Sequence, residues 1–178
     1  ALARQDSNYT YGATSSYGQP LVTQAKEGAL KVGASSDVET RTTTYDYSGA
    51  NGLALGQPTT VTTDPRGLNL QHVTKYDANG NVIATIMPGN PTGGDAHETD
   101  TTYYRAGTGS GVAACDSKPQ FAGFVCQTAL AAQPGGSLPA IPTTTYTYDI
   151  WGNTLTRTDT SGVATRTWTY TYDAAGRL

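Results

Sequence analysis

The chain has 178 residues, with 11 basic and 14 acidic side chains and a formal net charge of -3. This weak acidity leaves no basic stripe that could displace counterions, so the composition argues against nucleic-acid binding. No apolar run approaches the roughly 18 residues of a membrane span. Residues 1–10 also lack the apolar core of a signal peptide.

The composition favours strands over helices. Leu, Ile, Val and Phe together number 26, near 15% of the chain, which is below the level of about 20% that accompanies disorder when the net charge is large. The net charge is small, however, and 12 Tyr, 2 Trp and 31 Thr supply strand-forming side chains. Since 21 Gly and 9 Pro punctuate them, we expect an ordered protein of short strands.

Two degenerate hairpin units open the chain. The first runs from Tyr9-Thr10-Tyr11-Gly12 to Gly18-Gln19-Pro20-Leu21, and the second runs from Tyr45-Asp46-Tyr47 to Gly56-Gln57-Pro58-Thr59. Tyrosine-rich runs that lead through glycine into a Gly-Gln-Pro segment predict two strands joined by a turn. Both units are expected to be hairpins with lengthened turns.

Three later copies of the motif are clean and share one spacing. The dipeptide Tyr-Asp is followed by two variable residues and a glycine. An aspartate at the first turn position accepts a hydrogen bond from the backbone two residues on, and the glycine supplies a positive φ. Each copy therefore predicts a strand, a tight turn and a returning strand. With the degenerate second unit, the motif residues are Tyr45, Asp46, Tyr76, Asp77, Gly80, Tyr148, Asp149, Gly152, Tyr172, Asp173 and Gly176.

A second type of turn alternates with the Tyr-Asp motif. We expect it at Asp64-Pro65-Arg66-Gly67, before Tyr76, and at Asp159-Thr160-Ser161-Gly162, before Tyr172. The run of residues 165–172 alternates strictly between four threonines and Arg166, Trp168, Tyr170 and Tyr172. Such alternation predicts a strand with a threonine face and an aromatic face.

Residues 105–142 are rich in glycine and proline and are expected to be an irregular insertion that contains both cysteines. Cys115 and Cys126 are candidates for a disulfide, with free thiols as the alternative. Two cysteines cannot make a four-ligand zinc site.

We therefore expect an all-β fold of meandering antiparallel β-hairpin repeats, in which residues 1–178 form one array and part of a curled sheet. Stacked tyrosines at equivalent positions are expected to form ladders between neighbouring hairpins. The chain stops at Leu178, directly after a Tyr-Asp turn. This predicts a fragment of a larger protein whose other segments close the sheet edges.

The alternation of Tyr-Asp-x-x-Gly units with Asp-x-x-Gly turns resembles the Rhs, or YD-repeat, family. The resemblance is specific at residues 58–87 and 143–178, and the insertion is similar to inserts of large secreted Rhs proteins of Gram-positive bacteria. Members of the family wind β-hairpins into a hollow shell around a C-terminal toxin, and relatives include toxin-complex C subunits, wall-associated proteins and teneurins. The resemblance implies a bacterial, secreted or cell-surface wall segment. Its partners would be the flanking YD repeats and the toxin domain of the same polypeptide.

One stretch also resembles the segment at which Rhs shells cleave themselves, Asp64-Pro65-Arg66-Gly67-Leu68. Asp64 would then take part in an aspartyl autoprotease. The family's cleavage site follows all repeats, whereas here Tyr76-Asp77 comes soon afterwards, so a plain turn is the favoured interpretation. With no nucleophile elbow, no phosphate loop and only His72 and His97, we expect no enzyme and no cofactor.

Two further groups of residues could bind a ligand. Asp95, His97, Glu98 and Asp100 are the one cluster of potential metal ligands, and a solvated loop is favoured over a metal site. Trp151 and Trp168 could stack on sugar rings, which makes a surface adhesin or carbohydrate-binding module the alternative function. The competing interpretation is that Trp168 belongs to the packed aromatic face and Trp151 covers a turn.

Overall fold

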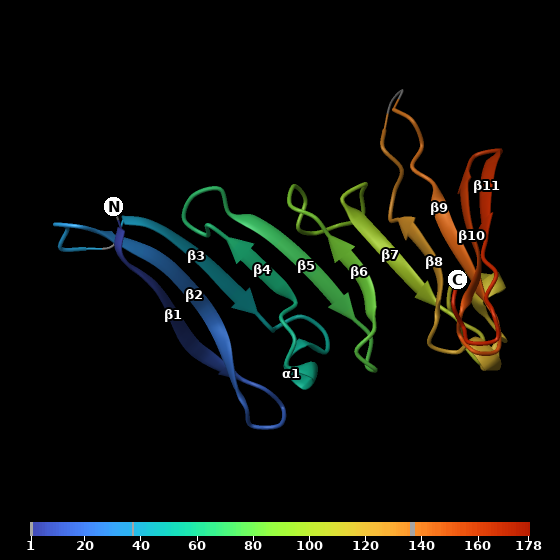
Figure 1. Cartoon of the computed structure of the whole chain (residues 1–178), viewed down its shortest axis with the longest axis horizontal. Helices are drawn as coiled ribbons and strands as arrows, with labels where there is room; N and C mark the ends of the chain where they lie inside the picture. The colour runs from blue at the N-terminus through green and yellow to red at the C-terminus, as the bar shows by residue number, and fades with distance from the viewer. Residues whose placement is uncertain (1, 37, 136–137) are drawn as a thin grey trace. The chain divides into compact units, whose positions relative to one another are not determined.

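The computed structural model describes residues 2–36, 38–135 and 138–178. The chain divides into two compact units, Ala1–Thr92 and Gly93–Leu178. This division was not predicted, because hairpin motifs continue on both sides of it. In each unit the strands are antiparallel and lie in chain order (Figure 1), so the predicted all-β hairpin meander is confirmed. Among the described residues, no helix is long and apolar enough to cross a membrane.

The described residues of the first unit form a meander of six strands and one short helix. Strands β1 and β2 pair over most of their length, and each later strand pairs with the one before it. Threonine, valine and tyrosine make up most of β3 and all of β4, as expected for residues that favour the pleated backbone. The elements are β1 (Leu2–Thr14), β2 (Pro20–Lys31), β3 (Val38–Asp46), α1 (Gly52–Leu55), β4 (Thr60–Thr63), β5 (Leu70–Tyr76) and β6 (Val82–Ile86).

The lengthened turn expected after Tyr45 contains α1 and a buried anchor. Tyr47 is buried and its hydroxyl donates to the carbonyl of Val22 on β2 (2.8 Å). Thr59 is also buried, and its hydroxyl donates to the carbonyl of Asp46 (3.2 Å). Together these bonds tie the start of the loop to β2 and its end to β3.

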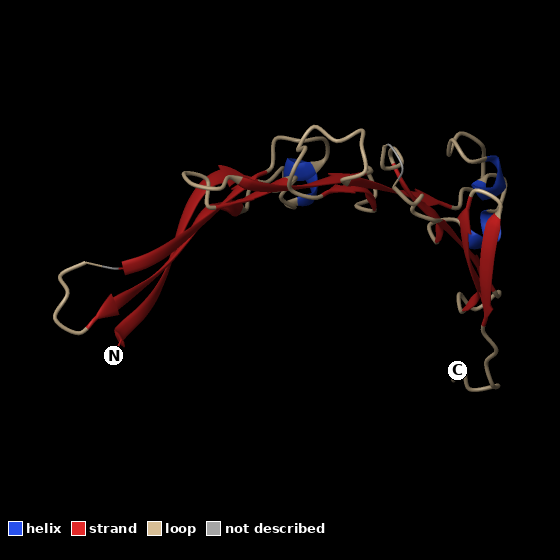
Figure 2. Cartoon of the chain, turned by 90° about the horizontal axis from the view of Figure 1, so that it is seen from above, coloured by secondary structure: helices blue, strands red, loops and turns tan. Residues whose placement is uncertain are grey.

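Where the structure describes the second unit, it has five strands and two short 3-10 helices. Figure 2 shows the strands as a single layer, with the helical segments beside it. Such a layer has few positions that are covered on both faces. The strands are β7 (Glu98–Tyr103), β8 (Val125–Leu130), β9 (Thr143–Tyr148), β10 (Thr154–Ser161) and β11 (Ala164–Thr169), and the 3-10 helices are Ala113–Cys115 and Pro119–Phe121.

The expectation of a wholly irregular segment at residues 105–142 was wrong. Strand β8 lies inside it and pairs with β7 on one side and β9 on the other. The rest of the described segment forms loops and the two 3-10 helices. The strand was missed because its sequence, Val-Cys-Gln-Thr-Ala-Leu, contains no tyrosine and lies among glycine- and proline-rich segments.

The second predicted turn of the second unit lies later than expected. Asp159 and Thr160 belong to β10, and Ser161 pairs with Ala164 across a two-residue loop of Gly162 and Val163. Asp159 is instead a sheet residue: its carboxylate accepts hydrogen bonds from Arg157 Nη2 (3.1 Å) and from the Thr144 hydroxyl (2.8 Å). Asp159 therefore stabilises the sheet through its bonds to Arg157 and Thr144 and does not close the predicted turn.

Strands β9, β10 and β11 carry a threonine face, as predicted for residues 165–172. Three threonines of each strand stand in register, and neighbouring hydroxyls bond one another, for example Thr147 to Thr156 (2.6 Å) and Thr158 to Thr167 (3.0 Å). Such cross-strand pairs each contribute about 0.2–1 kcal/mol. The three rows are Thr143, Thr160 and Thr165; Thr145, Thr158 and Thr167; and Thr147, Thr156 and Thr169.

The core of the second unit forms around a disulfide between Cys115 and Cys126, whose Cα atoms lie 5.7 Å apart. Both cysteines are buried together with Tyr104. Partly buried apolar residues pack against this centre, namely Val112, Phe121 and Tyr148. The disulfide and its aromatic neighbours therefore provide the buried volume that the threonine-rich strands lack.

Candidate functional site

The Tyr-Asp turn has a defined hydrogen-bond pattern, seen clearly at Asp149. The backbone N–H groups of Trp151 (2.8 Å) and Asn153 (2.9 Å) both donate to Asp149 Oδ1, and Asn153 Nδ2 donates to Oδ2 (2.9 Å). Gly152 has a φ of 86° and its N–H donates to the Asp149 carbonyl (3.2 Å). The predicted bond two residues on and the predicted positive φ are both confirmed. The residue after the glycine completes the turn, a role that the sequence analysis did not assign.

The same geometry recurs at the other two clean copies. Asp77 receives the backbone N–H groups of Asn79 and Asn81 and the side-chain amide of Asn81, each at 2.9 Å. At Asp173 the fifth residue is Arg177, whose Nε donates to Oδ2 (2.8 Å). Asn and Arg are therefore equivalent at the fifth position of the turn, because each side chain donates a hydrogen bond to Oδ2 of the aspartate.

The first hairpin contains a hidden version of this turn, at residues 15–19. The N–H of Ser15 donates to the carbonyl of Gln19 (2.9 Å), and the N–H of Gly18 donates to the carbonyl of Ser15 (2.9 Å). Here the Ser15 hydroxyl accepts the N–H of Gln19 (3.1 Å) in place of a carboxylate. The sequence predicted a hairpin with a lengthened turn here. The hairpin is present, but its turn keeps the standard five-residue length.

Three tyrosines of the motif donate hydrogen bonds to backbone carbonyls earlier in the chain. The hydroxyl of Tyr148 donates to the carbonyl of Val125 (2.9 Å), and that of Tyr172 donates to the carbonyl of Thr154 (2.9 Å). Tyr76 makes the longest of these bonds, to Pro58 (3.4 Å). In the second degenerate unit Asp46 accepts the N–H of Ser48 (2.9 Å), but Tyr47 makes the corresponding tyrosine bond rather than Tyr45.

The expected tyrosine ladder takes a different form. Aromatic contacts form one cluster in the second unit, where Tyr148 lies 5.1 Å from Phe124 and 6.3 Å from Tyr104, between ring centroids. Burial raises the pKa of both tyrosine hydroxyls. Tyr76 and Tyr172 instead contribute hydroxyl bonds to backbone carbonyls.

The turn carboxylates predict a loss of stability in acid. The side-chain amide of Asn153 first, then backbone N–H groups, hold the pKa of Asp149 below its usual 3.8. The backbone and side chain of Arg177 do the same for the pKa of Asp173. For Asp77, partial burial is the largest single effect and raises the pKa, but the hydrogen bonds from Asn81, Asn79 and Gly80 together outweigh it and lower the pKa.

A carboxylate whose pKa is lowered by folding stabilises the folded state above its unfolded pKa, and this contribution is lost as the pH falls through the lower folded value. The melting temperature should therefore fall between about pH 5 and about pH 2. Asp149→Asn should reduce the size of that fall in a thermal unfolding series. Glu27→Gln, at an exposed carboxylate that caps no turn, is the control. An equal reduction in both variants would contradict the role of the turn.

The Asp64 turn has the geometry of a plain turn. The Gly67 N–H donates to the Asp64 carbonyl (3.1 Å) and the Leu68 N–H donates to Asp64 Oδ2 (2.8 Å). A side chain at Gly67 would collide with the Asp64 carboxylate, which explains the glycine. The carboxylate thus holds the backbone of residues 67 and 68.

The two tryptophans lie in different surroundings. The Trp151 side chain sits on the Asp149 turn and is 82% exposed. Trp168 is half-buried on β11, and the guanidinium carbons of Arg166 and Arg157 lie 4.4 Å and 4.9 Å from its ring centroid. Trp168 is therefore already engaged in cation–π contacts, whereas Trp151 presents an open ring.

The candidate metal ligands are engaged with their own loop. Asp95 Oδ1 accepts the backbone N–H of His97 (2.8 Å) and lies 3.2 Å from His97 Nδ1. Glu98 is buried and its Oε2 accepts the N–H of Gly94 (2.6 Å). Asp100 lies in β7. In the described part of the chain, no three His, Cys, Asp or Glu side chains are grouped as metal ligands would be.

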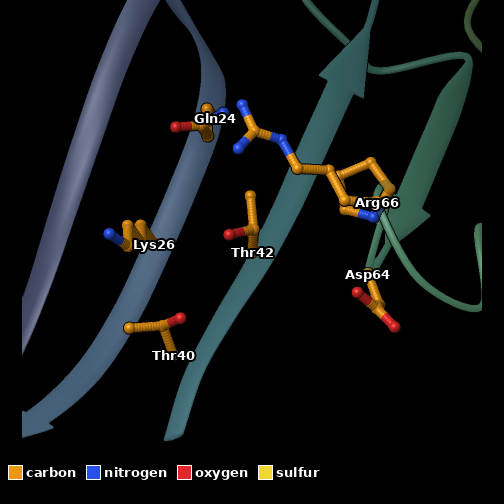
Figure 3. Close-up of a pocket in the computed structure, with 7 residues that line it drawn as sticks. Gln24, Lys26, Thr40, Thr42, Asp64 and Arg66 are labelled. Atoms are coloured by element: carbon orange, nitrogen blue, oxygen red, sulfur yellow. The ribbon is translucent and has the colours of Figure 1, made fainter. Parts of the chain in front are cut away.

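The first unit has a polar pocket of about 320 Å³ on one face of β2 and β3. Lys26 pairs with Thr42 across these strands, so their side chains share a face. The Asp64 turn closes one side, and Arg66 extends across β3 toward Gln24 (Figure 3). The pocket was not predicted. Its lining residues are Gln24, Lys26, Thr40, Thr42, Asp64, Pro65 and Arg66.

The second unit has an apolar pocket of about 370 Å³ beside the disulfide, with Tyr104, Phe121 and Tyr146 among its lining. A shallower hollow of about 270 Å³ lies between Tyr146, Tyr170 and Tyr172. Neither hollow contains a motif for catalysis. No protein-family model matches the chain, and no curated protein matches its sequence.

Proposed function

We propose that this chain is a structural segment of a YD-repeat wall, of the kind that Rhs-type bacterial proteins build around a C-terminal toxin. The three clean Tyr-Asp turns, which share one backbone hydrogen-bond pattern, carry the proposal. Each turn is closed by its own aspartate. The tyrosine hydroxyls bond earlier parts of the chain: Tyr148 bonds β8, Tyr172 bonds β10, and Tyr76 bonds Pro58 in the loop before β4. Repeats joined in this way are stabilised mainly by their neighbours, so a wall can be extended without a central core.

The disulfide supports an extracellular location. Disulfides persist in oxidising surroundings and are rare in the cytosol. Cys115 and Cys126 form the buried centre of the second unit, so this unit would lose its main fixed contact in a reducing compartment. A secreted or cell-surface wall would lie in the oxidising environment that keeps this disulfide intact.

A surface adhesin or carbohydrate-binding module is the second candidate function, and the 82% exposure of Trp151 favours it. An open indole ring can stack on a sugar face. The cation–π contacts of Trp168 make that residue the poorer candidate. Titration with glycans, followed by tryptophan fluorescence, should give a saturable change that Trp151→Ala abolishes if this function holds.

Limited proteolysis of the full-length polypeptide tests the wall. If this segment encloses a domain that follows it, the downstream domain should resist protease in the intact protein. Tyr148→Ala, which removes a strand-to-strand bond, should make the downstream domain sensitive. Trp151→Ala, in the same turn but exposed, should leave it protected. Equal sensitivity of the downstream domain in the intact protein and in Tyr148→Ala would contradict enclosure.

A further inference from the structure

The polar pocket of the first unit carries an arrangement of charges that the wall function does not use. Two cationic side chains, Lys26 and Arg66, line it from different elements, one from β2 and one from the turn after β4. Both are exposed. Neither forms an ion pair with a carboxylate among the described residues. Two cations that line one hollow without a carboxylate partner in the described part of the chain, in a protein of net charge -3, point to a negatively charged ligand.

Asp64 is the one carboxylate in the lining, and it is hydrogen-bonded within its own turn. Asp64 Oδ2 accepts the backbone N–H of Leu68 at 2.8 Å. Figure 3 shows the Asp64 carboxylate on the far side of the turn from the Arg66 guanidinium. Two cations and one carboxylate leave a net positive lining. The turn thus uses Asp64 to hold the backbone and presents Arg66 over the sheet.

The remaining lining groups are neutral donors and acceptors. Thr40 and Thr42 follow one another on the same face of β3, and Gln24 lies on the same face of β2. Hydroxyl and amide groups can donate to oxygen atoms that the two cations do not reach. The floor of the pocket is therefore polar.

We propose that this pocket binds a small oxyanion ligand, either a phosphate monoester or a carboxylate. Arg66 would supply the planar fork that matches two oxygens of either group, and Lys26 would supply a compact second charge. The threonine hydroxyls and the Gln24 amide would bind the remaining oxygens. The volume of about 320 Å³ is at the lower end of the range for ligand pockets, roughly 300–1,000 Å³, so the ligand is small.

NMR titration of the whole chain at constant ionic strength tests this proposal, with inorganic phosphate, acetate and chloride as probes. Phosphate or acetate should shift the backbone amides of Thr42 and Arg66 along a saturable curve, and chloride should not. Arg66→Gln and Lys26→Gln should each weaken the binding about tenfold or more, as expected for a hydrogen bond to a charged group. Arg41→Gln removes one charge from the opposite face of β3 and should leave the binding unchanged.

The relative affinity of the probes identifies the source of the oxyanion. Tighter binding of phosphate assigns the site to phosphate esters, and binding of acetate that equals or exceeds it assigns the site to carboxylates. Three results would overturn the proposal: no saturable shift with either probe, an equal response to chloride, or an equal loss in Arg41→Gln. Since the wall function is tested by proteolysis of the full-length protein, the two can fail separately.

Discussion

Replacing Cys115 and Cys126 together by alanine should lower the free energy of unfolding of the second unit by about 3 kcal/mol. The bond joins residues separated by 11 positions, and in the chain-entropy model a loop of about 15 residues is worth about 3 kcal/mol. Cys115 is fully buried, so the loss would also loosen the aromatic residues packed against it. A single layer of threonine-rich strands has little other buried surface to offset the loss.

Urea denaturation followed by tryptophan fluorescence measures this effect, because Trp151 and Trp168 both lie in the second unit. A reducing agent should destabilise the native protein by a similar amount and should have no effect on the double alanine variant. If the variant and the native protein unfolded at the same urea concentration, the disulfide would have no part in the stability of the core.

The Tyr-Asp turns could be predicted from the sequence because their hydrogen bonds are local. Asp77 bonds residues two and four positions ahead, so the motif contains all that the turn requires. The tyrosine bonds could not be predicted in this way. Tyr148 bonds the carbonyl of a residue 23 positions away, and only the register of β8 and β9 brings the two together.

Two sequence expectations failed for a related reason. Strand β8 was missed because its side chains give no alternating aromatic signal, and it is recognised as a strand only through its neighbours β7 and β9. Asp159 was assigned to a turn because Asp and Gly three residues apart are typical of one. The side chains that hold Asp159 in the sheet are Arg157, on the same strand β10, and Thr144, on the neighbouring strand β9.

The polar pocket of the first unit could not be predicted from local sequence patterns. Lys26 and Arg66 are 40 positions apart in the chain, and nothing near either residue forms a known motif. The pocket exists because the turn after β4 folds over β3 and carries Arg66 toward β2 (Figure 3). Sites of this kind depend on strand order and register, and a repeat motif specifies only the hairpins.

Tyr148→Ala should destabilise the second unit by about 3 kcal/mol. This value is at the lower end of the range for aromatic-to-alanine changes in cores, because Tyr148 is only partly buried. The change removes contacts with Phe121 and Phe124 and the bond to the Val125 carbonyl. The ring thus links the end of β9, the start of β8 and the loop that carries the disulfide.

Tyr148→Phe separates the hydroxyl from the ring and should cost about 1 kcal/mol, the usual net value of one hydrogen bond. Ile150→Ala is the matched control, because Ile150 belongs to the same turn and is 80% exposed, and it should change the stability little. Urea unfolding by tryptophan fluorescence ranks the three variants. If Tyr148→Phe and Tyr148→Ala were equally destabilised, the hydroxyl bond would account for the whole contribution of Tyr148, and the ring contacts for none of it. If Ile150→Ala matched Tyr148→Ala, the loss would reflect the turn rather than the tyrosine, and the strand-to-strand bond would not be the element that joins one repeat to the next.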